Sequence, residues 1–217
     1  MSVITIERKI LEKNYEIANE NRKFFKSKKL KVINILSSPG SGKTSILEKL
    51  IEELKGKIKI AVIEGDVQTD FDAQRIEKCK VPVVQIVTNG GCHLDAGLVR
   101  DALKNLNLDG IDLLIIENVG NLVCPAGYDL GEDFKIVIHS TTEGDDKPLK
   151  YPKMFINSQI LIINKIDLLE YVNCNIEELK KNALAINPKL RIFETSCFTG
   201  QGMSQLCEWL IQLVINN

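Results

Sequence analysis

The sequence predicts an α/β fold, a doubly wound and mostly parallel β-sheet with helices on both faces. From residue 32 onward, short apolar runs typical of buried parallel strands alternate with segments whose apolar residues recur at helical spacing. A glycine-rich turn, residues 37–44, separates the first apolar run from the first helical segment. Such alternation is typical of parallel sheets covered by helices on both sides. Ligands of these sheets bind at the carboxyl ends of the strands.

Seven strands and five helices are expected in this alternating region. The strands are predicted at 32–37, 58–63, 82–87, 112–116, 134–139, 159–164 and 190–195. The helices are predicted at 43–54, 70–79, 95–105, 176–186 and 203–215. A chain of 217 residues is long enough for one α/β domain with a full core, which we assign to residues 31–217.

Residues 1–30 differ from this pattern and predict an amphipathic helix that begins near Thr5. Apolar pairs separated by charges recur every seven residues, at Val3–Ile4, Ile10–Leu11, Ile17–Ala18 and Phe24–Phe25. Because this repeat is short for a coiled coil, packing against the domain is the favoured interpretation. The alternative is a helix that contacts a partner or a second copy of the chain.

The charge balance excludes some classes of partner. With 28 basic and 29 acidic residues, nothing predicts a nucleic-acid-binding or membrane-binding surface. No apolar run is long enough to span a bilayer, and no signal peptide precedes the first charged residues. We therefore expect a cytoplasmic protein. In such a reducing compartment the six cysteines are thiols, and metal binding is more plausible than disulfides.

The stretch Ser37–Thr44 has the composition of a phosphate-binding turn between a strand and a helix. Glycines let backbone N–H groups close around phosphates, and the helix N-terminus adds a positive dipole. The residues expected to bind the nucleotide here are Gly40, Ser41, Gly42, Lys43, Thr44 and Ser45. Lys43 would reach the outer phosphates, and the Thr44 hydroxyl would bind Mg²⁺. The pattern G-x-x-x-x-G-K-[ST] has glycine where this chain has Ser37, and the alternative is an ordinary glycine turn.

Asn164-Lys165-Ile166-Asp167 ends a predicted strand and has the residues needed to select guanine. The Asp167 carboxylate can accept hydrogen bonds from the ring N–H and the exocyclic amine of guanine, whereas adenine offers an acceptor and a donor. Lys165 can lie over the base, and Asn164 can tie this loop to its neighbours. After a phosphate loop, this motif predicts GTP rather than ATP. Ser196 and Cys197 follow the last strand and could cap the guanine carbonyl, or form a plain polar loop.

Acidic residues at two other strand ends are candidates for Mg²⁺ binding and catalysis. Glu117 could hold Mg²⁺ through water, and the Gly120 amide could approach the γ-phosphate. Asp66 and Asp72 are candidates for coordinating Mg²⁺ and orienting the attacking water. Asp72 could instead be a first-turn acid favoured by the helix dipole. Together with Lys43, these three carboxylates form the predicted catalytic set.

Cys92-His93 and Cys124-Pro125 lie after the third and fourth predicted strands. Two thiolates and an imidazole suit Zn²⁺ or another borderline-soft ion such as Ni²⁺. Small buried cysteines are the alternative, but Gly-Gly before one pair and proline in the other favour exposed loops. Three ligands do not close a tetrahedral site, so water or a second chain must supply the rest.

The remaining candidates favour structural roles. Cys79, Cys174 and Cys207 have no spacing partner and are expected to be structural. His139 is expected to be a loop histidine with its hydrogen bonds satisfied. The segment 145–153, with charges and two prolines, is expected to be a solvated surface loop; contact with a partner's nucleotide is the alternative.

Five motifs together resemble the HypB hydrogenase nickel-incorporation GTPases, over residues 30–217. They lie at residues 37–44, 64–75, 90–95, 117–125 and 164–167. The resemblance includes serine at position 37, and Cys-His paired with Cys-Pro is its most specific part. It implies a SIMIBI-type G domain that forms a homodimer with nucleotide at the interface. It also implies nickel delivery to the large subunit of [NiFe]-hydrogenase, together with other maturation proteins. The family's interfacial metal site would then map onto Cys92, His93 and Cys124.

Other functions remain open at this point. A G protein serving another metalloenzyme, such as urease or a cobalamin enzyme, would share most of these motifs. A nucleoside or nucleotide kinase would share the phosphate loop but has no use for the guanine-reading motif. A zinc-binding interaction module with a vestigial GTP site is a third alternative.

Overall fold

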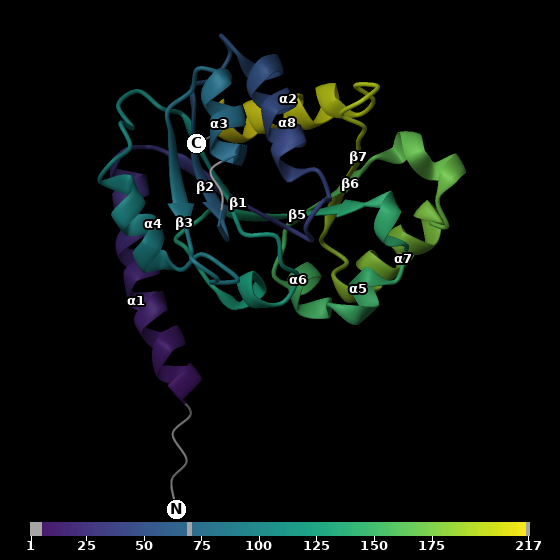
Figure 1. Cartoon of the computed structure of the whole chain (residues 1–217), viewed down its shortest axis with the longest axis horizontal. Coiled ribbons are helices and arrows are strands. Elements are labelled where there is room, and N and C mark those ends of the chain that lie inside the picture. The colour runs from purple at the N-terminus through teal and green to yellow at the C-terminus, as the bar shows by residue number, and fades with distance from the viewer. Residues whose placement is uncertain (1–5, 69–70, 216–217) are drawn as a thin grey trace, which may run out of the picture.

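The computed structural model describes residues 6–68 and 71–215, and in these seven strands form one parallel sheet (Figure 1). The strands are β1 (Lys31–Ser37), β2 (Ile60–Asp66), β3 (Val83–Val87), β4 (Leu113–Glu117), β5 (Phe134–Ser140), β6 (Ile160–Asn164) and β7 (Arg191–Glu194). Their order across the sheet is β3-β2-β4-β1-β5-β6-β7. Each observed strand overlaps one of the seven predicted strands. The predicted fold class, a doubly wound parallel sheet, is confirmed.

Helices cover both faces of this sheet, as Figure 1 shows. On one face lie α2 (Lys43–Leu54), α3 (Phe71–Lys78) and α8 (Met203–Ile215). On the other lie α1 (Ile6–Ser27), α4 (Ala96–Leu103), α5 (Lys147–Lys150), α6 (Pro152–Ile156) and α7 (Ile176–Ile186). Because both faces are covered, every residue of β4 and β6 is buried. This explains why these strands are continuous apolar runs rather than alternating ones.

The register brings the functional loops to one edge of the sheet. On β1, Ile35 pairs with Glu117 of β4, and Glu117 also pairs with Glu64 of β2. Ser140, the last residue of β5, pairs with Asn164, the last residue of β6. The carboxyl ends of these strands therefore open onto a shared surface, where parallel sheets bind ligands.

The helix α1 packs along α4 and the loop before β5. Ala18 and Phe25 of α1 are buried, and Phe25 joins the apolar cluster beneath α4. The Asn21 side chain donates to the carbonyls of Ala96 and Leu130, at 2.9 and 3.0 Å. Arg22 Nη2 donates to both carboxylate oxygens of Asp129, at 2.7 and 2.8 Å. Thr5, where the sequence places the start of this helix, lies outside the described residues.

The prediction of a solvated loop over residues 145–153 is wrong, because this segment forms α5 and enters α6. Pro148 and Pro152 lie in the first turns of the two helices, where proline is tolerated because those N–H groups have no helical acceptor. Met154 and Phe155 then fill the core beside Leu161. His139 is also not in a loop. It lies buried in β5, with its Nε2 atom 2.7 Å from the Gly144 carbonyl.

Among the described helices, none combines the length and apolar character needed to cross a bilayer.

Candidate nucleotide site and metal centre

The turn between β1 and α2 has a backbone that glycine alone accommodates easily. Gly40 and Gly42 have φ values of 74° and 96°. A Cβ atom on Gly42 would lie 2.5 Å from Nδ2 of Asn164, so the missing side chain also lets the two loops meet. Asn164 Nδ2 donates to the Ser41 carbonyl at 3.0 Å, and Lys165 Nζ donates to the Gly40 carbonyl at 2.7 Å. The predicted phosphate and guanine motifs are thus in direct contact.

Ser37 has a local role that sequence reasoning did not assign. Its hydroxyl accepts a hydrogen bond from Lys43 Nζ at 2.9 Å and donates to the Ser38 carbonyl at 2.6 Å. Glycine, which the general pattern has at this position, could make neither bond. The departure from the pattern was the signal that could have identified this residue.

The Thr44 hydroxyl donates to Glu117 Oε1 at 2.9 Å, which joins the phosphate turn to the end of β4. Glu117 is buried beside Glu64, its register partner on β2. Burial, with the Glu117 charge as the next cause, raises the pKa of Glu64 to about 10. Burial also raises the pKa of Glu117, whereas the nearby Lys43 charge opposes that rise. The two buried carboxyl groups therefore resist being charged together.

Glu64 was missed as a site residue because it follows an ordinary apolar run. An acidic residue at the end of a buried strand was the available signal. Within the described part of the chain, Glu64 Oε1 and Glu117 Oε2 are buried without a hydrogen-bond partner. Buried oxygens of this kind, beside a threonine hydroxyl, suit a hard cation and its water ligands.

Most of the predicted phosphate and Mg²⁺ residues line one cavity of about 470 Å³. They are Gly40, Gly42, Lys43, Thr44, Ser45, Asp66, Asp72, Glu117 and Gly120, and Lys165 of the predicted guanine motif lines the same cavity. Ser41 is buried and does not line this cavity. Asp66 accepts the Val67 N–H at the end of β2, and Asp72 pairs with Arg75 in the first turn of α3.

The loop predicted to read guanine lies beside this cavity, which Lys165 lines. Lys165 adopts a left-handed backbone, with φ at 62°, and Asp167 follows it at the start of a 3₁₀ helix, η3 (Ile166–Tyr171). Asn164 Oδ1 accepts the Thr195 hydroxyl at 3.3 Å and lies 3.9 Å from Cys197 Sγ. Burial, followed by the Asp167 charge, raises the pKa of Cys197 to about 11, so Cys197 stays a thiol. Ser196 is fully buried, and its hydroxyl accepts the Thr199 N–H.

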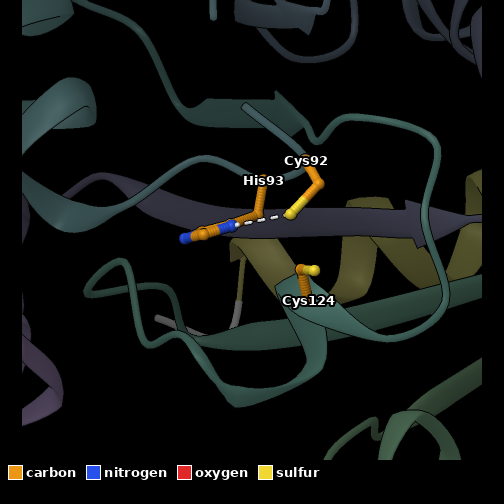
Figure 2. Close-up of side chains that lie close together, drawn as sticks. All are labelled: Cys92, His93 and Cys124. Carbon is orange, nitrogen blue, oxygen red and sulfur yellow. Dashed lines mark hydrogen bonds between the residues drawn. The ribbon is translucent and has the colours of Figure 1, made fainter. Parts of the chain in front are cut away.

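A second group of side chains consists of Cys92, His93 and Cys124, which lie close together, as Figure 2 shows. One ligand atom from each lies within 4.8 Å of the others. Cys92 and His93 come from the loop after β3, and Cys124 begins a 3₁₀ helix, η1 (Cys124–Gly127). Cys92 Sγ lies 3.5 Å from His93 Nδ1.

The surroundings of this cluster act differently on its thiols and its imidazole. A hydrogen bond with the neighbouring Cys124 thiol, followed by burial, raises the pKa of Cys92, so a proton must leave when a metal binds. Burial lowers the pKa of His93 and so favours the neutral imidazole, which is the form that binds metals. The His93 ring lies against Tyr128, with ring centroids 3.8 Å apart. Tyr128 was not predicted, and its place four residues after Cys124 gave only a weak signal.

Comparison with known proteins places these features in a family context. The family model described as "CobW/HypB/UreG, nucleotide-binding domain" matches residues 31–194. Hydrogenase maturation factor HypB of Escherichia coli K12 is 47% identical over 208 residues, 96% of this chain and 72% of that protein. The crystal structure of HypB from Helicobacter pylori in complex with nickel superposes with a TM-score of 0.89. It is 39% identical and aligns over 94% of this chain and 96% of that one.

A more distant structure shares only the fold. The signal recognition particle receptor FtsY from Elizabethkingia anophelis is 15% identical, with a TM-score of 0.56 over 83% of this chain and 65% of that one. This likeness agrees with the predicted doubly wound parallel sheet.

Proposed function

Because the chain belongs to the HypB hydrogenase maturation factors of the CobW/HypB/UreG family, we propose that it is a GTPase that inserts nickel during [NiFe]-hydrogenase maturation. The family membership confirms the resemblance found in the sequence motifs. The proposed partners are a second copy of the chain, the hydrogenase large subunit and other maturation proteins. Residues 31–217 form the proposed GTP-binding domain, with residues 1–30 as a helical extension. The proposed location is the cytoplasm, whose reducing conditions keep the thiols free to bind metal.

One observation carries this proposal. The ligand atoms of Cys92, His93 and Cys124 lie within 4.8 Å of one another. Cys124 lies in the segment that follows β4, and the same segment carries Gly120, which lines the cavity together with Glu117 at the end of β4. A soft-metal ligand set is thus continuous with the loop that lines the phosphate cavity. Neither a nucleoside kinase nor a structural zinc module requires this arrangement, so it favours the metal-delivering GTPase.

The nucleotide cavity has the groups needed for phosphoryl transfer to water. Lys43 and the backbone N–H groups of the turn bind the phosphates. They stabilise the negative charge that develops on the leaving group during the transfer. Thr44, Asp66 and Asp72, with Glu117 acting through water, would hold Mg²⁺, which supplies positive charge beside the phosphates. Asp66 and Asp72 are the candidates to orient the attacking water.

The loop after β4 is placed to respond to the γ-phosphate. A Cβ atom on Gly120 would lie 3.1 Å from Pro39 Cα, so this glycine packs directly on the phosphate turn. Loss of the γ-phosphate removes a hydrogen-bond partner for the Gly120 amide. The resulting movement of the loop would shift Cys124 relative to Cys92.

Nickel is the proposed cargo, and Zn²⁺ suits the same donors. Two sulfurs and one imidazole leave a tetrahedral site incomplete. A facing copy of the chain would complete the site or bridge two ions, which links metal binding to dimerisation.

Guanine selection is tested by Asp167→Asn. The substitution replaces the carboxylate that accepts two guanine donors, so we expect GTP affinity to fall by about 1.5–3 kcal/mol. Affinity for xanthosine nucleotides should rise, because the new amide donates to the xanthine carbonyl. Competition against a fluorescent GDP analogue measures both changes. Equal competition by ATP and GTP for the unchanged protein would contradict base selection by Asp167.

Dimerisation is expected to depend on both ligands. A non-hydrolysable GTP analogue and Zn²⁺ or Ni²⁺ should each strengthen the dimer, and each should tighten binding of the other by about 5- to 150-fold. Sedimentation velocity with GDP or the analogue, with and without metal, measures this dependence. Cys92→Ala should lose the metal-dependent part, whereas Cys174→Ala, outside the ligand group, should retain it. A dimer population indifferent to nucleotide and metal would rule out this gating.

A further inference from the structure

Asn118 connects the phosphate-facing loop to the metal-binding loop. Its side chain is 1% exposed, and it follows Glu117 directly. The Asn118 Oδ1 atom accepts two backbone hydrogen bonds, from Leu94 N and from its neighbour Val119 N, each at 3.0 Å. Leu94 is the residue after His93. One buried amide thus holds the backbone beside a metal ligand.

A chain of buried polar groups fixes the orientation of this amide. Asn118 Nδ2 donates to Asn34 Oδ1 at 3.2 Å, and Asn34 Nδ2 donates to Glu132 Oε1 at 3.3 Å. Glu132 accepts the Leu130 N–H through its other oxygen at 2.6 Å. Since the carboxylate lies at the accepting end, both amides must present nitrogen toward it and oxygen away from it. The Asn118 oxygen is thereby directed at Leu94.

Leu94 is also held from the side of β2. Its side chain is fully buried, and a Cβ atom on Gly65 would lie 2.8 Å from Leu94 Cδ1. Gly65 precedes Asp66, and both line the nucleotide cavity together with Asn118. Leu94 therefore lies between two segments that face the phosphates, one contacting its backbone and the other its side chain.

We propose that Asn118 is a positioning residue that couples the nucleotide state to metal affinity, through its hydrogen bond to Leu94 N. The inference rests on the proposed function and identifies the residue through which the two sites communicate. A buried N–H group without an acceptor is strongly disfavoured, so the 92–94 loop must follow Asn118 when the loop after β4 moves. Movement at the γ-phosphate thus reaches His93 as well as Cys124.

The test is a titration of Zn²⁺ under saturating GDP and under a saturating non-hydrolysable GTP analogue. The ratio of the two metal dissociation constants measures the coupling, and saturation removes any effect on nucleotide affinity. For the unchanged protein we expect a ratio of about fivefold or more, and for Asn118→Leu a ratio below about twofold. Leucine is close to asparagine in size but offers no acceptor. Asn118→Asp keeps an acceptor toward Leu94 and should retain most of the ratio.

Asn187→Ala is the control, because the Asn187 side chain also hydrogen-bonds a distant part of the backbone, in its case by donating to the carbonyls of Phe155 and Ser158. It should keep the full ratio. Hydrogen exchange at Leu94 N–H gives a second readout, and we expect faster exchange in Asn118→Leu. Should that variant fail to fold, the coupling role is tested by the exchange rate of Leu94 N–H in the unchanged protein. We expect this rate to differ between the GDP-bound and the analogue-bound states.

A wild-type ratio in Asn118→Leu, or equal Leu94 exchange in both nucleotide states, overturns the coupling role. A ratio of one in an unchanged protein that still binds both GTP and metal also overturns the coupling role. Failure of the unchanged protein to bind GTP or metal overturns the proposed function itself. The two failures are therefore distinguishable.

Discussion

Lys43→Ala is expected to lower the rate of GTP hydrolysis by about 10²–10³-fold, the effect of removing one preorganised group that stabilises transition-state charge. Lys43 lines the nucleotide cavity, and its ammonium donates a hydrogen bond to the Ser37 hydroxyl, 2.9 Å away. A phosphate chain in the cavity would take over this contact. Release of inorganic phosphate under saturating GTP measures the loss.

Lys49→Ala is the matched control on the same helix. Lys49 lies six residues further along α2, is partly exposed and pairs with Glu52, so its loss should leave the rate unchanged. Lys43 does not belong to the apolar core, and thermal unfolding of Lys43→Ala should match the unchanged protein. Hydrolysis by Lys43→Ala at the original rate would show that the phosphate turn is misassigned.

Cys124→Ala is expected to weaken metal binding by more than about 100-fold, since even the loss of residues that only orient metal ligands costs about 10–100-fold. Cys124 supplies one of only three ligands in the cluster, and the thiolate is its strongest class of donor for Zn²⁺ or Ni²⁺. Competition with a chromophoric chelator measures the affinity. GTP binding should persist, because Cys124 is not among the residues that line the nucleotide cavity.

Cys79→Ala provides the comparison for this variant. Burial raises the pKa of the Cys79 thiol, which lies on the α2–α3 side of the sheet and outside the metal cluster. Its removal should not change metal affinity. If Cys124→Ala bound Zn²⁺ as tightly as the unchanged protein, the three side chains would have only a structural role.

The elements that the sequence predicts well are those with a strong periodic signal. Buried parallel strands are apolar on both faces, so β4 and β6, each with four apolar residues in a row before a polar last residue, stand out from their surroundings. The juxtaposition of Cys92 with Cys124 could also be inferred, because both follow strands whose carboxyl ends share one edge of the sheet. Predicting that two such residues lie close together requires only the topology of the sheet and no knowledge of side-chain packing.

Contacts that depend on register and packing could not be read from the sequence. Glu64 meets Glu117 only because β2 and β4 pair in one particular register. Asn34 lies inside an apolar strand, and its role emerges only when the loops that carry Asn118 and Glu132 pack around it. The helices α5 and α6 were missed because two prolines resemble a loop signal, although each proline lies in a first helical turn.

The order of strands in the sheet has a consequence for synthesis on the ribosome. The phosphate turn follows β1, yet both neighbours of β1, β4 and β5, come much later in the chain. A nascent chain that has emerged only through β3 already contains the complete turn but has no sheet to support it. The loops that contact the turn, at residues 164–165, emerge later still. A nucleotide site built from both the turn and this loop is therefore complete only late in synthesis, after residues 164–165 have emerged.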